Sequence, residues 1–103
     1  KNCTFESNNA VDGGGVLSSL GSLVIENSIF DSNDCTEYGG GVYINNYNQQ
    51  ASSVLINGNL FRGNVAQYGG ALHVGDSNAT VIHSNLFYDN HASVDLGTSD
   101  GGG

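Results

Sequence analysis

The sequence predicts an all-β protein, a single-stranded parallel β-helix (solenoid) of about four coils. Three observations predict this fold: a motif that occurs four times, sixteen glycines with no proline, and short apolar runs typical of strands. A chain of 103 residues allows one domain at most, so residues 1–103 are expected to form one β-helix segment.

An internal repeat covers the chain. The motif F-x-x-N occurs four times, and its phenylalanines are 25, 31 and 26 residues apart. Other residue types recur at set distances from these phenylalanines, and agreement at several positions identifies a repeated structural unit. The aligned positions are Phe5, Phe30, Phe61 and Phe87; Ile25, Ile56 and Ile82; Ala10, Cys35, Ala66 and Ala92; Asn8, Asn33, Asn64 and Asn90; and the glycine pairs Gly13 and Gly14, Gly39 and Gly40, and Gly69 and Gly70.

Two types of strand are expected in each unit. The runs before the phenylalanines are rich in β-branched residues, as are the runs that follow the glycine pairs, and all end in Gly, Asn, Ser or Asp. None has the period of an amphipathic helix. A unit of short strands and tight corners fits one coil of a parallel β-helix, with coils stacked about 4.8 Å apart. The expected strands lie in residues 22–28, 41–45, 53–58, 71–75 and 80–85.

Aligned residues should form columns along the helix axis. The phenylalanine, isoleucine and alanine/cysteine columns are expected to point inward and fill the core. The asparagines should stack at a corner and bond amide to amide. The glycines should turn the chain at positive φ and let adjacent coils approach closely. A phosphate-binding glycine loop is disfavoured, because no helix follows and no Lys or Arg is near. Two further inward columns are Val16, Val42 and Leu72, and Ser18, Ile44 and Val74.

The motifs resemble a known family. F-x-x-N alternating with GG[GA][VL], as in "FRGNVAQYGGALHV" at residues 61–74, is similar to the repeats of the chlamydial polymorphic outer membrane proteins. The resemblance covers essentially all 103 residues. It implies a right-handed parallel β-helix in a surface-exposed region, often adhesive or structural, and it does not imply an enzyme. Only Gly69-Gly70-Ala71 has the GGA form that is common in that family; the other copies read GGG.

Charge narrows the classes of partner. The formal net charge is −8, with Lys1 and Arg62 as the only basic residues except for histidines. This argues against binding nucleic acid or an anionic membrane surface. No apolar run approaches the roughly 20 residues of a membrane helix, so no membrane insertion is expected in this segment. No signal peptide is visible. No cofactor is expected, although the acidic surface allows weak Ca²⁺ binding.

The ends and the outer surface suggest packing partners. Neither end of the sequence has a capping element, so the chain is expected to be an excerpt of a longer repetitive protein or a subunit that stacks end to end into a fibre. Alternation along the strands points Val24, Leu55 and Val81 outward, as an apolar stripe for lateral contact. The alternative is that these three pack under a loop or into the core. Expected partners are therefore other copies or neighbouring repeats, or a host or matrix protein or glycan.

Other features concern recognition and modification. Two insertions, at residues 45–53 and 91–100, should form loops, either for recognition or simply solvated. The sequons at Asn2 and Asn78 accept N-glycans if the chain enters a eukaryotic secretory route. Cys3 and Cys35 are seven positions apart around the coil, which disfavours a mutual disulfide and leaves partners in adjoining coils open.

A catalytic site is not expected in this segment. The carboxylates are scattered over different columns, and so are His73, His83 and His91, which disfavours a carboxylate pair or a metal site. Asp31 is the expected neighbour of Arg62 in the adjacent coil. The sequence therefore predicts a non-catalytic extracellular or cell-surface β-helix, a rigid stalk, adhesin or fibre subunit that displays loops or glycans. The alternative is part of a carbohydrate-processing, pectin-lyase-like β-helix whose active coils lie elsewhere.

Overall fold

The computed structural model describes residues 1–19, 22–45, 53–75 and 79–93, and these ranges form fourteen short strands and no helix. The strands make four parallel sheets, each named here after the column that it carries. The phenylalanine sheet contains β1 (Thr4–Glu6), β5 (Ile29–Asp31), β9 (Leu60–Arg62) and β13 (Leu86–Tyr88); the alanine sheet contains β2 (Asn9–Ala10), β6 (Asp34–Cys35), β10 (Val65–Ala66) and β14 (His91–Ala92); the valine sheet contains β3 (Val16–Ser19), β7 (Val42–Asn45) and β11 (Leu72–Gly75); and the isoleucine sheet contains β4 (Leu23–Glu26), β8 (Ser53–Asn57) and β12 (Ala79–His83).

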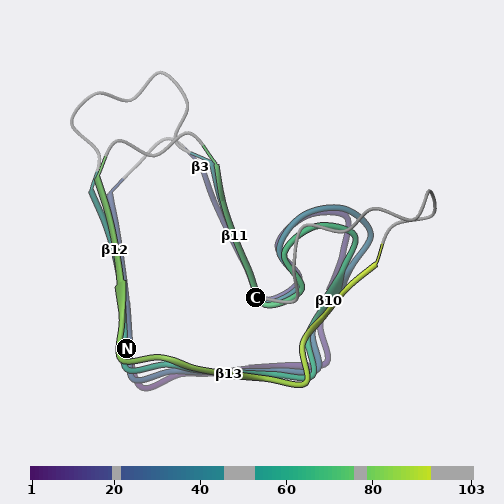
Figure 1. Ribbon diagram of the computed structural model, residues 1–103, viewed down its shortest axis with the longest axis horizontal. Coiled ribbons are helices and arrows are strands. Elements are labelled where there is room, and N and C mark those ends of the chain that lie inside the picture. Colours follow the sequence, from purple (N-terminus) through teal and green to yellow (C-terminus); the bar gives the residue numbers. More distant parts are fainter. Residues whose placement is uncertain (20–21, 46–52, 76–78, 94–103) are drawn as a thin grey trace.

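Successive coils lie directly over one another. In Figure 1 the coils superpose when the molecule is viewed down its shortest axis, with one strand of each sheet per coil. All strand pairs are parallel, and they join residues one repeat apart, such as Phe5 to Phe30, Phe30 to Phe61 and Phe61 to Phe87. The predicted all-β parallel β-helix is confirmed.

The structure has more strands per coil than the sequence suggested. The predicted strands form the valine and isoleucine sheets. The strands of the phenylalanine and alanine sheets were not predicted. Their strands have only two or three residues, and some read Asp-Cys or Val-Ala. Such short segments carry no period of their own. They are extended because the coils above and below bond to them.

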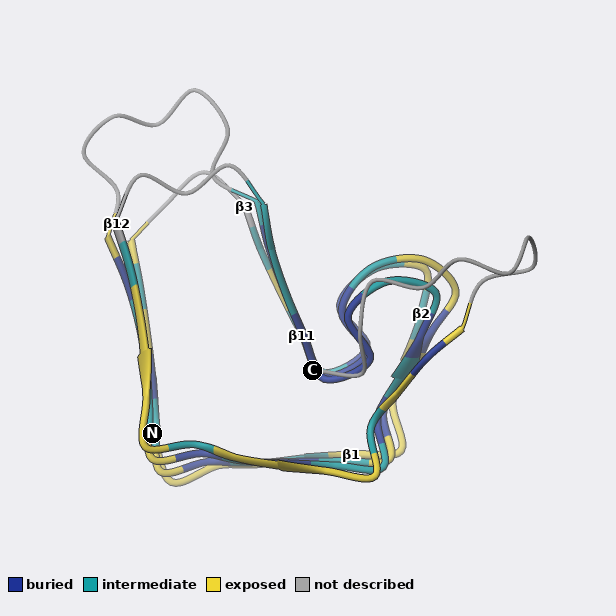
Figure 2. Cartoon of the chain, viewed as in Figure 1, coloured by how far each residue is buried: buried dark blue, intermediate teal, exposed yellow. Residues whose placement is uncertain are grey.

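The core is a set of inward columns. The ring centroids of Phe5 and Phe30 are 4.9 Å apart, those of Phe30 and Phe61 4.8 Å, and those of Phe61 and Phe87 4.8 Å, with planes within 7° of parallel. Ile44 and Ile56 are also fully buried in the middle coils, and these buried positions are dark blue in Figure 2.

The columns are not buried along their whole length. Ile82 and Phe87 are in register with their columns but are 45% and 36% exposed. Phe5 and Ala10, at the other end, are only half-buried. The expectation that each inward column fills the core therefore needs correction: among the described residues, burial is complete in the middle coils and varies at the outermost strands, where Ile25, Leu72 and Ala92 remain buried.

The phenylalanine rings should contribute unequally to the free energy of unfolding, depending on their place along the helix axis. Replacing Phe61 with alanine removes a fully buried ring between two others and should lower the free energy of unfolding by about 3–5 kcal/mol. Phe87→Ala, in the same column, should cost clearly less, because that ring is already partly in water. Urea unfolding of both variants tests this. Equal losses would show that burial does not set the contribution of each ring.

Three columns of left-handed residues turn the described part of the chain. Two of these columns are mostly not glycine, with φ between 51° and 71°, and Asn, Ser and Asp are among the residues that tolerate this conformation best. The third is the first residue of each glycine pair. The columns are Asn2, Asn27, Gly58 and Ser84; Ser7, Ser32, Gly63 and Asp89; and Gly13, Gly39 and Gly69.

Candidate functional site

The predicted asparagine column forms a continuous hydrogen-bonded ladder. Asn33 Nδ2 donates to Asn64 Oδ1 (3.0 Å) and to the carbonyl oxygen of Phe5 (2.9 Å). Asn33 Oδ1 accepts from the backbone N and from Nδ2 of Asn8 (3.2 and 2.9 Å). Asn64 repeats the arrangement with Asn90 and Phe30. Both donors and both lone pairs of the Asn33 amide are used, which satisfies a fully buried polar side chain.

A second ladder was missed by the sequence analysis. Asn59 Nδ2 donates to Asn85 Oδ1 (3.0 Å) and to the carbonyl oxygen of Ile25 (2.9 Å), and Asn59 Oδ1 accepts from the backbone N of Ser28 (2.9 Å). Asn59 and Asn85 each stand two residues before a repeat phenylalanine. The same position holds Ser28 and Cys3 in the first two coils, and this variation hid the column. Each ladder residue directly follows a left-handed position.

The two residues of a glycine pair have different roles. Gly39 has φ +67°, so the first position supplies the left-handed turn. Gly40 is needed for close approach: a Cβ there would overlap the carbonyl oxygen of Gly70 and would lie 2.6 Å from that of Val65. The same crowding by backbone holds for Gly14 and Gly70. The pairs therefore fit backbone against backbone at the corner.

The expected apolar stripe lies on the outer face of the isoleucine sheet. Val24 and Val81 are 59% and 54% exposed, and Leu55 is half-buried. A second apolar column on the outer face of the phenylalanine sheet was not predicted. It borders a shallow groove at the corner between these two sheets and consists of Ile29, Leu60 and Leu86.

Asp31 and Arg62 form the expected ion pair. Arg62 Nη2 lies 3.0 Å from Asp31 Oδ2 on the outer face of the phenylalanine sheet. The Arg62 guanidinium, helped by the Ser32 hydroxyl, holds the pKa of the Asp31 carboxyl below its ordinary value of 3.8. Both groups are accessible to solvent, so the pair contributes little to stability.

The ion pair should make a small contribution to thermal stability that is lost in acid. Because the pKa of Asp31 is lowered on folding, its stabilisation is present above 3.8 and is lost as the pH falls through the folded value. Asp31→Asn should therefore lower the Tm slightly at neutral pH and not at all in strong acid. Thermal unfolding at both pH values, with and without added salt, measures this. A difference that persists in strong acid would contradict the ion pair as its source.

The cysteines, sequons and insertions carry no assembled site among the described residues. Cys3 and Cys35 are both free thiols, and burial raises the pKa of the Cys35 thiol. Asn2 is exposed at a left-handed corner, and its backbone N donates to Glu26 O. Asn78 and most of both insertions lie outside the described residues.

Within the described ranges, no group of three or more His, Cys, Asp or Glu side chains could hold a metal ion. A search of the same residues found no helix that could span a membrane.

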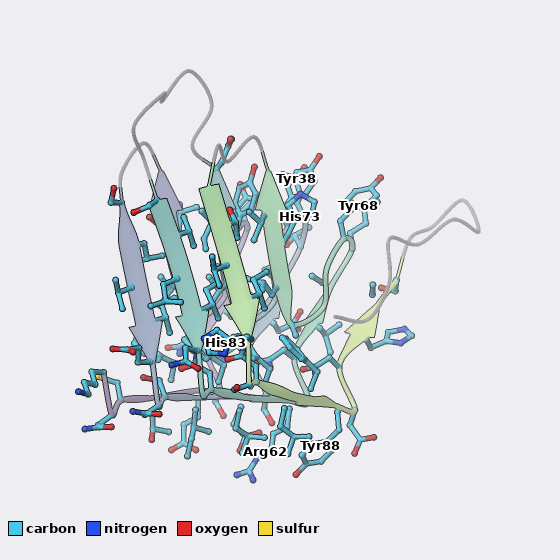
Figure 3. All side chains as sticks on the ribbon, turned by 60° about the vertical axis from the view of Figure 1, so that its left-hand side comes forward. Tyr38, Arg62, Tyr68, His73, His83 and Tyr88 are labelled. Atoms are coloured by element: carbon cyan, nitrogen blue, oxygen red, sulfur yellow. The ribbon has the colours of Figure 1, made fainter. Side chains whose placement is uncertain are left out.

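Four rings gather on the outer face of the valine sheet, and this cluster is the best candidate for a binding site. The aromatic cluster consists of Tyr38, Tyr43, Tyr68 and His73, all half-buried. The centroid of Tyr38 is 5.2 Å from those of Tyr43 and Tyr68 and 4.9 Å from that of His73. Figure 3 shows Tyr38 beside His73, with Tyr68 on the neighbouring turn.

The sequence analysis did not identify this cluster. Tyr43 and His73 share one column with Leu17 on the valine sheet, but Tyr38 and Tyr68 belong to a different part of the repeat. They precede the glycine pairs, and the corner folds them back beside the valine sheet, where they pair with each other as a parallel bridge. The signal was available as the recurring Tyr-Gly-Gly at residues 38–40 and 68–70.

Comparison with known proteins agrees with this architecture. A family model described as "Right handed beta helix region" matches residues 1–102. Neither the curated proteins nor the solved structures gave a significant match. With its stacked parallel coils and a match that spans nearly its whole length, the chain belongs to the right-handed β-helix family.

Proposed function

We propose that the chain is a non-catalytic structural segment of an extracellular or cell-surface protein, where it acts as a rigid, adhesive stalk. The observation that carries this proposal is the continuity of the columns. One phenylalanine stack and one asparagine ladder run through all four coils, so each coil is bonded and packed to the next. A body tied together in this way resists bending and can hold surface groups at fixed spacing.

The surface location and the adhesive role rest on the resemblance to the repeats of the chlamydial polymorphic outer membrane proteins. The net charge of −8 suits a solvated surface. The apolar stripe of Val24, Leu55 and Val81 would serve lateral packing against another copy or a neighbouring repeat. Glycans at Asn2 or Asn78 would be displayed from such a stalk. Protease treatment of intact source cells should release peptides of this chain, and their complete protection would contradict a surface location.

Amide hydrogen exchange tests the rigidity. In a stiff stalk, the amides that donate between coils, such as those of Asn33, Asn64 and Val65, should exchange together through one cooperative opening. Peptide-level exchange followed by mass spectrometry resolves the coils. Exchange of one middle coil at the rate of an unfolded peptide, while its neighbour stays protected, would refute a rigid stalk.

The proposal that the chain is non-catalytic is tested by a separate activity assay. The chain should release no reducing ends and no unsaturated uronate from a panel of neutral and acidic polysaccharides, with or without Ca²⁺. Sustained product release that follows the purified chain would instead support the carbohydrate-processing alternative.

A further inference from the structure

The aromatic cluster is a preformed group of four rings centred on Tyr38, whose ring contacts the other three. Tyr38 and Tyr68 stack along the helix axis on the turn, while Tyr43 and His73 pair along the same axis on the valine sheet. Backbone bonds hold the turn: Gly13 N donates to Tyr38 O (2.8 Å), and Gly39 N donates to Tyr68 O (2.9 Å). Backbone hydrogen bonds between coils therefore position the rings before any ligand arrives. Binding would cost little conformational entropy in the cluster.

Acidic residues adjoin the rings. Asp12 occupies the position of Tyr38 in the preceding coil, and its Oδ1 accepts from Tyr38 N (3.3 Å). Glu37, next to Tyr38 in the chain, is exposed. No lysine or arginine is near: the chain has only Lys1 and Arg62, and Figure 3 shows Arg62 on the phenylalanine sheet, well away from Tyr38 and His73.

Ring faces and carboxylates together select a cation. An ammonium or guanidinium group is attracted to the face of a tyrosine ring, most strongly by rings that are partly desolvated. The net charge of −8 adds attraction at longer range and repels acidic glycans and other anions. A second copy of this chain is a poor source of the cation, because it has only Lys1 and Arg62, and Arg62 is already paired with Asp31.

We propose that the aromatic cluster binds an arginine or lysine side chain from a basic segment of a protein partner. The cation lies against the ring face that the Tyr38–Tyr68 stack leaves open, and Asp12 provides the opposite charge at the Tyr38 end of the stack. The inference goes beyond the stalk function, since a stalk can be rigid with or without this site, and hydrogen exchange does not test it.

The test uses N-acetyl-arginine amide as the probe, titrated into the folded chain and followed by NMR. Stacking on the rings should move the side-chain methylene protons of the probe upfield and shift the ring signals of Tyr38, Tyr68 and His73. N-acetyl-citrulline amide, the neutral analogue, should bind at least about fivefold more weakly, since cation–π and charge attraction are both removed.

Two variants and a control locate the site. Tyr68→Leu should weaken probe binding about three- to fivefold. Asp12→Asn keeps the acceptor for Tyr38 N, removes one charge and should also weaken binding. Glu26→Gln, on the outer face of the isoleucine sheet, removes the same charge and should leave binding unchanged. Circular dichroism checks that each variant is folded.

Three results would overturn the proposal. Equal binding of the arginine and citrulline probes would exclude recognition of the cation. Unchanged binding by both Tyr68→Leu and Asp12→Asn would place the probe elsewhere. A shift of the same rings by methyl β-glucoside, with none caused by the arginine probe, would make the cluster a neutral-glycan site.

Discussion

Replacing Gly40 with alanine should prevent stable folding or lower the free energy of unfolding by more than about 3 kcal/mol. The added Cβ would overlap the carbonyl oxygen of Gly70 and would lie 2.6 and 2.8 Å from the backbone O and N of Val65. These are main-chain atoms of the next coil, which is held by its own ladders and cannot move aside alone. Relief would require the coils to separate, with loss of the stacking on both sides of the corner.

Gly75→Ala is the matched control. A Cβ at Gly75 meets no atom closer than 3.9 Å, and its φ is not in the left-handed region. Alanine should therefore be neutral, or should stabilise by up to about 1 kcal/mol through the unfolded state. Urea unfolding of both variants gives the comparison. Similar stabilities would mean that the corner glycines are not required for the approach of the coils.

Replacing Asn64 with leucine should cost about 3–5 kcal/mol. The side chain keeps a similar size but loses its amide. The backbone N and Nδ2 of Asn33 lose their acceptor, and the carbonyl oxygen of Phe30 loses a donor, all at a fully buried site. Each buried polar group left without a partner costs roughly 1–3 kcal/mol. Urea or thermal unfolding measures the loss.

Asn8→Leu provides the comparison within the same column. Asn8 is exposed in the first coil and loses only its side-chain bond to Asn33 Oδ1, while the bond from its backbone N remains. The cost should be about 1 kcal/mol or less. If Asn8→Leu were as damaging as Asn64→Leu, the ladder would act through local turn geometry and not through buried hydrogen bonds.

Alignment of the repeat was sufficient to predict which residues stack. Phe30 lies over Phe5 and Ile56 over Ile25, because a parallel coil places residues one repeat apart in register. The register holds on both sides of the insertion at residues 45–53, where Tyr43 pairs with Leu17 and Leu55 pairs with Val24. The second ladder escaped notice because Cys3 and Ser28 replace asparagine in two coils. The hydrogen bonds of this ladder depend on a position directly after a left-handed residue. Residue types alone do not show which residues are left-handed.

The coil, its columns and its corner glycines could be predicted from residue types that recur at a fixed spacing, and the acidic character could be predicted from composition alone. How deeply each column member is buried depends on what packs around it in three dimensions, as the fully buried Phe61 and the partly exposed Phe87 show within one column. The aromatic cluster likewise arises only in the folded chain. Tyr38 and Tyr43 meet across a glycine corner, and Tyr68 and His73 join them from the next coil, through contacts that depend on the path of the corner.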